Sequence, residues 1–102
     1  MNGGNRVEIV IQDSALNWFK KEMDVETGDA IRFYARYGGS SPFHEAFSLG
    51  MTREQPHDQG LTKEIDGILF YIEKDDLWFF NEHSLIVSVN ESLDELHYEY
   101  EK

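Results

Sequence analysis

The tightest constraint on the fold of this chain is the dipeptide Asp66-Gly67, which lies between two runs rich in apolar residues. A two-residue hairpin turn needs positive φ at both central residues, and Asp-Gly is one of the pairs that supply it. This turn fixes the opposed residues: Ile65 with Ile68, Lys63 with Phe70 and Leu61 with Ile72 on one face, Glu64 with Leu69 and Thr62 with Tyr71 on the other. The first face is mainly apolar, so we expect it to point into the core.

A second hairpin is expected around the turn formers between Gly38 and Pro42. The run before them, residues 31–37, alternates as a half-buried strand does, with Ile31, Phe33, Ala35 and Tyr37 on one face. The run after them, residues 43–49, alternates less cleanly because Glu45 interrupts it. We expect this turn to present any small site, and its candidate residues are Gly38, Gly39, Ser40, Ser41 and His44.

The other segments complete a β-rich pattern. The expected elements are a strand over residues 7–11, a helix from Asp13 or Ser14 to Met23, a long mobile loop from Gly50 to Gly60, a short helical turn over residues 77–80, and strands over residues 85–89 and 96–100, the last at a sheet edge. This order predicts a single α+β domain over residues 1–102. It is β-dominated, with packed mixed sheets and one main N-terminal helix.

Charge and composition narrow the range of partners. The chain has 20 acidic and 9 basic residues, a formal net charge of −11. Nucleic acids and anionic membranes require a positive surface, so neither is an expected partner, whereas a basic protein partner is compatible. We expect no leader and no membrane-spanning segment, and hence a cytoplasmic protein; a homodimer is left open. The absence of cysteine excludes disulfides, thiolate metal sites and thiol catalysis.

The strand that runs into Gly38-Gly39-Ser40-Ser41, followed by a second aromatic run, resembles the first signature of the HesB/IscA-like family of iron–sulfur cluster assembly proteins. In cluster-carrying members this turn reads Gly-Cys-Ser-Gly, and Ser40 stands at the position of the ligand cysteine. Pro42 stands where the family usually has glycine. The likeness is strongest to the cysteine-free branch of uncharacterised bacterial proteins, the YneR type. It implies a HesB-like domain and a non-catalytic accessory or interaction role related to iron–sulfur metabolism.

The resemblance breaks at the atoms that would hold a cluster. Family carriers add a Cys-Gly-Cys motif near the C-terminus, whereas this chain ends in Tyr98-Glu99-Tyr100-Glu101-Lys102. Iron–sulfur clusters are held by thiolates, and a serine hydroxyl is far less acidic and a poorer ligand. We therefore expect no cofactor, and we expect Ser40 to serve the tight turn.

An alternative function is a small-molecule or mononuclear-metal-binding domain that uses the turn from Gly38 to Pro42 and the loop from Gly50 to Gly60. His44 and Glu45 are adjacent in the expected strand, so their side chains face opposite sides. His57-Asp58 in the loop has no second histidine at a known ligand spacing. No metal ligand set is therefore assigned.

Catalysis has still weaker support. A hydrolase centred on Ser40 and His44 would need a nucleophile-elbow pattern, and none surrounds Ser40. No catalytic residue is assigned, and we expect the chain not to be an enzyme. The aromatic set Trp78, Phe79 and Phe80 favours a core with one exposed ring over a binding box.

Overall fold

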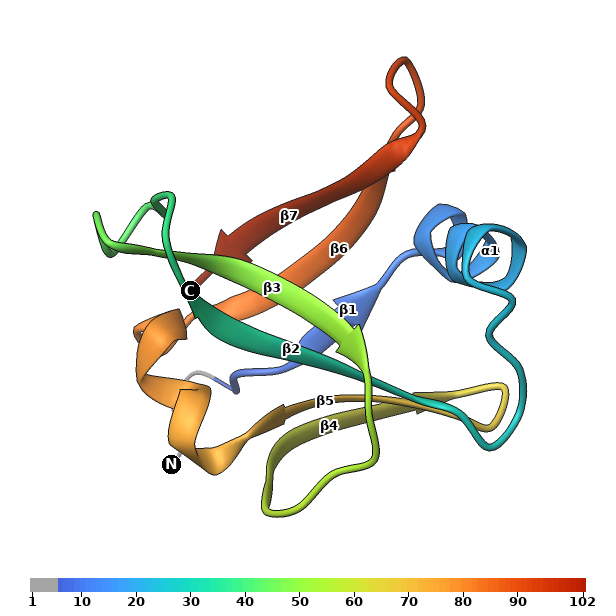
Figure 1. Cartoon of the computed structure of the whole chain (residues 1–102), viewed down its shortest axis with the longest axis horizontal. Coiled ribbons are helices and arrows are strands. Elements are labelled where there is room, and N and C mark those ends of the chain that lie inside the picture. Colours follow the sequence, from blue (N-terminus) through green and yellow to red (C-terminus); the bar gives the residue numbers. More distant parts are fainter. Residues whose placement is uncertain (1–5) are drawn as a thin grey trace.

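Two mixed β-sheets enclose one hydrophobic core in the computed structural model, which describes residues 6–102 (Figure 1). The three-stranded sheet has the order β1 (Ile9–Ile11), β6 (Ser84–Asn90), β7 (Glu95–Glu101); the four-stranded sheet has the order β3 (Phe47–Arg53), β2 (Ala30–Tyr37), β5 (Ile68–Glu73), β4 (Gln59–Ile65). β1 with β6 and β2 with β5 are parallel, and the other pairs are antiparallel. Helix α1 (Asp13–Glu22) and the short 3₁₀ helix η1 (Lys74–Phe80) complete the fold. The strand-dominated α+β architecture with mixed sheets is confirmed.

The β4–β5 hairpin has the register that its turn predicts. Ile65 is opposite Ile68, and the pairing continues in step to Leu61 opposite Ile72. Asp66 and Gly67 both have positive φ, 54° and 77°. The turn is anchored from outside, because Lys20 of α1 forms an ion pair with the Asp66 carboxylate at 2.8 Å.

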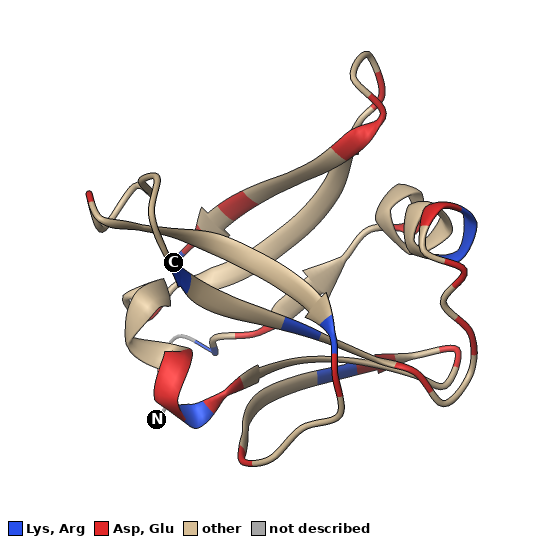
Figure 2. Ribbon diagram, viewed as in Figure 1, with Lys and Arg blue, Asp and Glu red and all other residues tan. Residues whose placement is uncertain are grey.

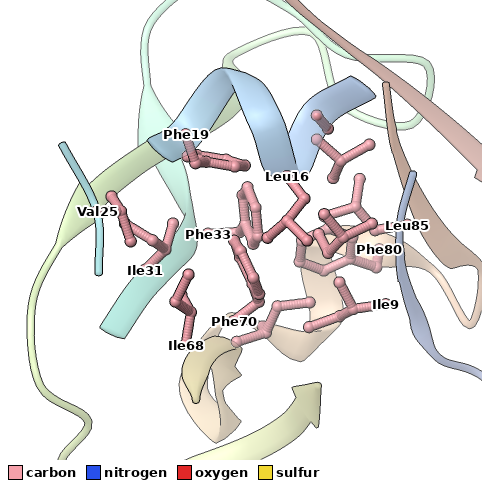
Figure 3. Packing of buried hydrophobic residues seen from close by; sticks show 14 of the residues in the cluster. Ile9, Leu16, Phe19, Val25, Ile31, Phe33, Ile68, Phe70, Phe80 and Leu85 are labelled. Atoms are coloured by element: carbon pink, nitrogen blue, oxygen red, sulfur yellow. The ribbon is translucent and has the colours of Figure 1, made fainter. Parts of the chain in front are cut away.

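The core gathers aromatic rings beneath α1 (Figure 3). The ring centroid of Phe19 lies 5.2 Å from that of Phe70 and 6.5 Å from that of Phe33. Phe33 also meets Tyr98 of the other sheet, edge to face, at 6.1 Å. All three phenylalanines are fully buried. One ring cluster therefore joins α1 to both sheets.

The predicted loop from Gly50 to Gly60 is wrong. Strand β3 continues to Arg53 and β4 begins at Gln59, so only residues 54–58 connect them. Gly50 serves packing rather than a turn, because a Cβ atom there would lie 2.5 Å from Cζ of the Tyr34 ring. Glycine inside a strand often marks such a close approach.

The hairpin around residues 38–46 exists and its first strand, β2, ends at Tyr37 as predicted, but its second strand begins later than predicted. β3 begins at Phe47, so residues 43–46 belong to the loop rather than to a strand. Tyr37 pairs with Phe47 at the end of the sheet and is 82% exposed, beyond the reach of the core. Helix α1 begins at Asp13, but its N-cap position is Gln12, which provides no side-chain cap.

We expect Gly67→Val to destabilise the protein by about 1–2 kcal/mol or more, because a branched side chain is strained at positive φ. The added Cβ would also lie 2.7 Å from Cγ2 of Thr27. Thr62→Val, on an exposed position of the same hairpin, is the control and should change stability by less than about 0.5 kcal/mol. Urea denaturation measures both, and equal midpoints for the two variants would contradict the strained turn.

Candidate functional site

The loop of residues 38–46 joins β2 to β3 and contains all five candidate residues. Gly38 and Gly39 have φ of 116° and 69°, a backbone that side chains with a Cβ rarely adopt. The Gly38 N–H donates to the Ala46 carbonyl, and the Ser48 hydroxyl donates to the Gly38 carbonyl, both at 2.8 Å. The paired glycines therefore act as predicted, and they fix where the loop leaves the sheet.

Ser40 and Ser41 have different environments within the loop. Ser40 is exposed, whereas Ser41 bonds locally: its N–H donates to the His44 carbonyl at 2.8 Å, and its Oγ accepts from the His44 N–H at 3.2 Å. No hydrogen bond among the described residues joins Ser40 to His44. The hydrolase hypothesis therefore gains no nucleophile–base contact from this geometry.

The imidazole of His44 lies among aromatic rings. Its centroid is 4.9 Å from that of Trp78 and 5.5 Å from that of Phe79, both on η1, and 6.5 Å from that of Phe47. Its Nε2 atom is buried and, within residues 6–102, has no hydrogen-bond partner. His44 thus contributes a packed ring here and connects the loop to η1. Phe79 and Phe80 are buried and Trp78 is 49% exposed, so the expected core with one exposed ring is confirmed.

Two shallow depressions adjoin along the line where the loop faces strand β7. One is lined by Ser40, Ser41 and Pro42 together with Leu96, Tyr98 and Tyr100 of β7, and the other by Pro42, Phe43, His83, Glu99 and the same two tyrosines. We call the two depressions together the β7 groove. Alternation in the sequence identified β7 as a strand. Nothing in the sequence indicated that the turn, some fifty residues earlier in the chain, would lie beside this strand.

Partial burial moves the ionisation of the two β7 tyrosines still further from physiological pH. It raises the pKa of both Tyr98 and Tyr100 to about 12, so their phenols are neutral at physiological pH. The Phe43 ring lies 5.4 Å from the ring of Tyr100 and 4.7 Å from that of His83. The groove therefore combines aromatic surface with two histidines, His83 and His97, and one acidic residue, Glu99, among its lining residues.

A cluster of charged and polar side chains lies apart from the β7 groove, on the face of β2 and β5 that turns away from the core. Arg32 bridges two acids, contacting Glu54 at 3.2 Å and Asp76 at 2.9 Å. The Tyr71 hydroxyl donates to the Glu54 carbonyl at 2.6 Å. The hydrogen bond with Asp76 raises the pKa of Arg32, against the effect of partial burial. These contacts hold residues 54–58 and η1 against the sheet.

Glu73 is the buried carboxylate of this cluster, with 6% of its surface exposed. It accepts hydrogen bonds from the backbone N–H groups of His57 at 2.9 Å and Asp58 at 3.0 Å. Burial alone would raise the pKa of Glu73, but these donors and the charge of Arg32 outweigh burial and lower it. Neither Arg32 nor Glu73 was predictable from the sequence, because their partners are distant in the chain.

The geometry does not assemble the metal site of the alternative function. His57 lies beside Glu54, 3.6 Å from its carboxylate, whereas His44 is packed among the rings of η1. Within residues 6–102, no group of three or more histidine, aspartate or glutamate side chains is placed to hold a metal ion. The same residues contain no helix long and apolar enough to cross a membrane.

Comparison with known proteins gives several full-length relatives. A Bacillus subtilis protein named pyruvate dehydrogenase inhibitor is 47% identical over 95 residues, which cover 93% of this chain and 100% of that protein. Uncharacterised proteins of Staphylococcus saprophyticus and Staphylococcus aureus are 34% and 33% identical, each over 90% of this chain and 97% of its own length. The chain therefore belongs to the same family as these Bacillus and Staphylococcus proteins.

The Bacillus relative confirms the predicted YneR type. The wider HesB/IscA-like assignment stays a prediction, because no family model matches the chain. No solved structure matches it either.

We expect Glu73→Gln to lower stability at neutral pH, because the amide cannot accept hydrogen bonds from both backbone donors through two oxygens. A carboxylate with a lowered pKa stabilises the fold above its unfolded pKa, and this contribution disappears as pH falls through the folded pKa. The stability difference between wild type and variant should therefore narrow as pH falls below the ordinary value of 4.5. Urea midpoints measured from neutral pH to acid test this. Glu64→Gln, exposed on β4, is the control, and a Glu73→Gln difference that stays constant with pH would contradict the role of the charge.

We expect the wild-type protein to hold no iron–sulfur cluster after anaerobic reconstitution with iron and sulfide and desalting. Ser40 stands where cluster-carrying members of the HesB/IscA-like family have a ligand cysteine. Ser40→Cys adds one exposed thiol per chain, which is too few to complete a thiolate ligand set. Ser40→Cys should keep at most a labile sulfide-to-iron absorbance band. A stable, stoichiometric cluster on the wild-type protein would overturn the expectation of no cofactor.

Proposed function

We propose that this protein is a non-catalytic regulator that binds an enzyme and inhibits it, and that the enzyme is a pyruvate dehydrogenase. The observation that carries the proposal is the identity of 47% to the Bacillus subtilis protein of that name, which extends over its whole length. Because the alignment covers the whole of that protein and 93% of this chain, any inhibitory surface of the relative has a counterpart here.

The charge of the molecule supports recognition of a partner with a basic surface. The acids Glu91 and Asp94 at the β6–β7 turn and Glu95, Glu99 and Glu101 on β7 lie along one hairpin (Figure 2). A one-sign field of this kind speeds the encounter with an oppositely charged surface and suppresses wrong partners. Association through this hairpin should weaken as salt screens the field over about 8–10 Å.

The link to iron–sulfur metabolism rests on the HesB/IscA-like resemblance alone. The relatives' names do not mention it, and Ser40 at the position of the ligand cysteine lies on the exposed side of its loop. The inhibitor proposal has the stronger support. It requires binding to an enzyme surface, whereas a role in iron–sulfur metabolism requires binding to a cluster or to the proteins that carry one.

The test adds the purified protein to the pyruvate dehydrogenase complex of the same organism and follows NADH formation from pyruvate, coenzyme A and NAD⁺. We expect a saturable fall in rate that is stronger at low ionic strength. The hairpin variant Glu91→Gln/Asp94→Asn/Glu95→Gln should slow association several-fold, because these charges lie together on the attracting surface.

The matched control is Glu22→Gln/Glu26→Gln/Glu64→Gln, which removes the same number of charges from α1, the linker after it and β4. It should slow association less than the hairpin variant does. Full enzyme activity at a large excess of wild-type protein would overturn the proposed function. Equal effects of the two variants would show that the acidic hairpin is not the surface that attracts the enzyme.

A further inference from the structure

We propose that the β7 groove receives a lysine or arginine side chain of the partner protein, carried on an extended segment that runs beside β7. This inference rests on the proposed function and names the surface and the partner chemistry through which the regulator would act.

The first support is the free edge of strand β7. β7 is the last strand of its sheet and pairs with β6 only. Among the described residues, no backbone hydrogen bond joins β7 to the loop of residues 38–46 that faces it. Outward backbone groups of an edge strand are a template for an added extended segment.

The second support is the chemistry of the groove beside that edge. The Phe43 ring centroid lies 4.7 Å from that of His83 and 5.4 Å from that of Tyr100, and Glu99 is among the residues that line the same depression. A cation over an aromatic face is attracted by the ring, and a neighbouring carboxylate adds an ionic contact. Because the tyrosines are neutral, they provide aromatic surface without adding charge.

The third support is charge complementarity. The residues lining both depressions include no lysine or arginine, and every second residue of β7 from Glu95 to Glu101 is exposed and is a glutamate, except for His97. An anionic segment would meet like charge along its whole length. A second copy of this chain, edge to edge, would set glutamates against glutamates, which is destabilising. A cationic segment can pair with the backbone groups of the strand edge and also place its positive charge in the groove.

The test uses short peptides of defined sequence as probes. A five-residue peptide of alternating valine and arginine, blocked at both ends, is titrated into the ¹⁵N-labelled protein, and the matched peptide carries citrulline in place of arginine. We expect the arginine peptide to shift amide signals of β7 and of residues 38–46, and the neutral peptide to bind at least several-fold more weakly. Equal binding of the two peptides, or shifts confined to another surface, would overturn the proposal.

Variants of the groove sharpen the result. Glu99→Gln and Phe43→Leu should each weaken binding of the arginine peptide by about two- to fivefold, because one removes the carboxylate and the other the ring face while an apolar side chain remains. Glu64→Gln, exposed on β4 of the other sheet, removes the same charge as Glu99→Gln and should leave binding unchanged. The amide spectrum of each variant shows that it is folded, and groove variants that bind like wild type would overturn the proposal.

The same variants separate this inference from the proposed function. If the wild-type protein inhibits pyruvate dehydrogenase and both groove variants inhibit equally well, the groove is not the docking surface and the regulator proposal stands. If the arginine peptide binds in the groove but the wild-type protein does not inhibit, the groove stands and the choice of enzyme is wrong.

Discussion

Phe33 is the residue at which the two sheets and the helix are held together. It is fully buried on the central strand β2 and contacts Phe19 of α1, Phe70 of β5 and Tyr98 of β7. Truncating a buried phenylalanine to alanine typically destabilises a protein by about 3–5 kcal/mol. Because β2 leads directly into the loop of residues 38–46, the contact between Phe33 and Tyr98 joins the strand that carries this loop to β7, the strand that the loop faces.

What the sequence predicts well in this chain is local. The Asp66-Gly67 turn fixes its own register, because the two positive φ values and the alternation on either side lie within a dozen residues. The error at Gly50 has the opposite origin. A glycine followed by polar residues is typical of a loop, and only the opposed Tyr34 ring, sixteen positions earlier in the chain, shows that the glycine makes room inside a strand. Local pattern cannot supply a contact of that range.

The same distinction divides the candidate site. The turn itself, with Gly38 and Gly39 at positive φ, was predictable because glycine pairs have few other uses. Its surroundings were not. His44 is covered by Trp78, and Phe43 contacts Tyr100, and these contacts arise only when η1 and β7 are brought to the loop by the packing of both sheets. A turn that looks like a small self-contained site is, in the folded chain, one wall of a groove.

The acidic side chains of strand β7 bear both on self-association of the strand edge and on the partner chemistry proposed for it. An open strand edge attracts other chains, and charged side chains on the strand are the usual protection against self-association. Here the protecting side chains are all of one sign, because Glu95, Glu99 and Glu101 are exposed and no lysine or arginine lies between them on the strand. A uniformly acidic edge repels a second copy of itself and most of the anionic surfaces in a cell, yet it leaves its backbone groups open to a cationic segment. The charges that keep this edge from pairing indiscriminately therefore also define the chemistry of the partner that it would accept.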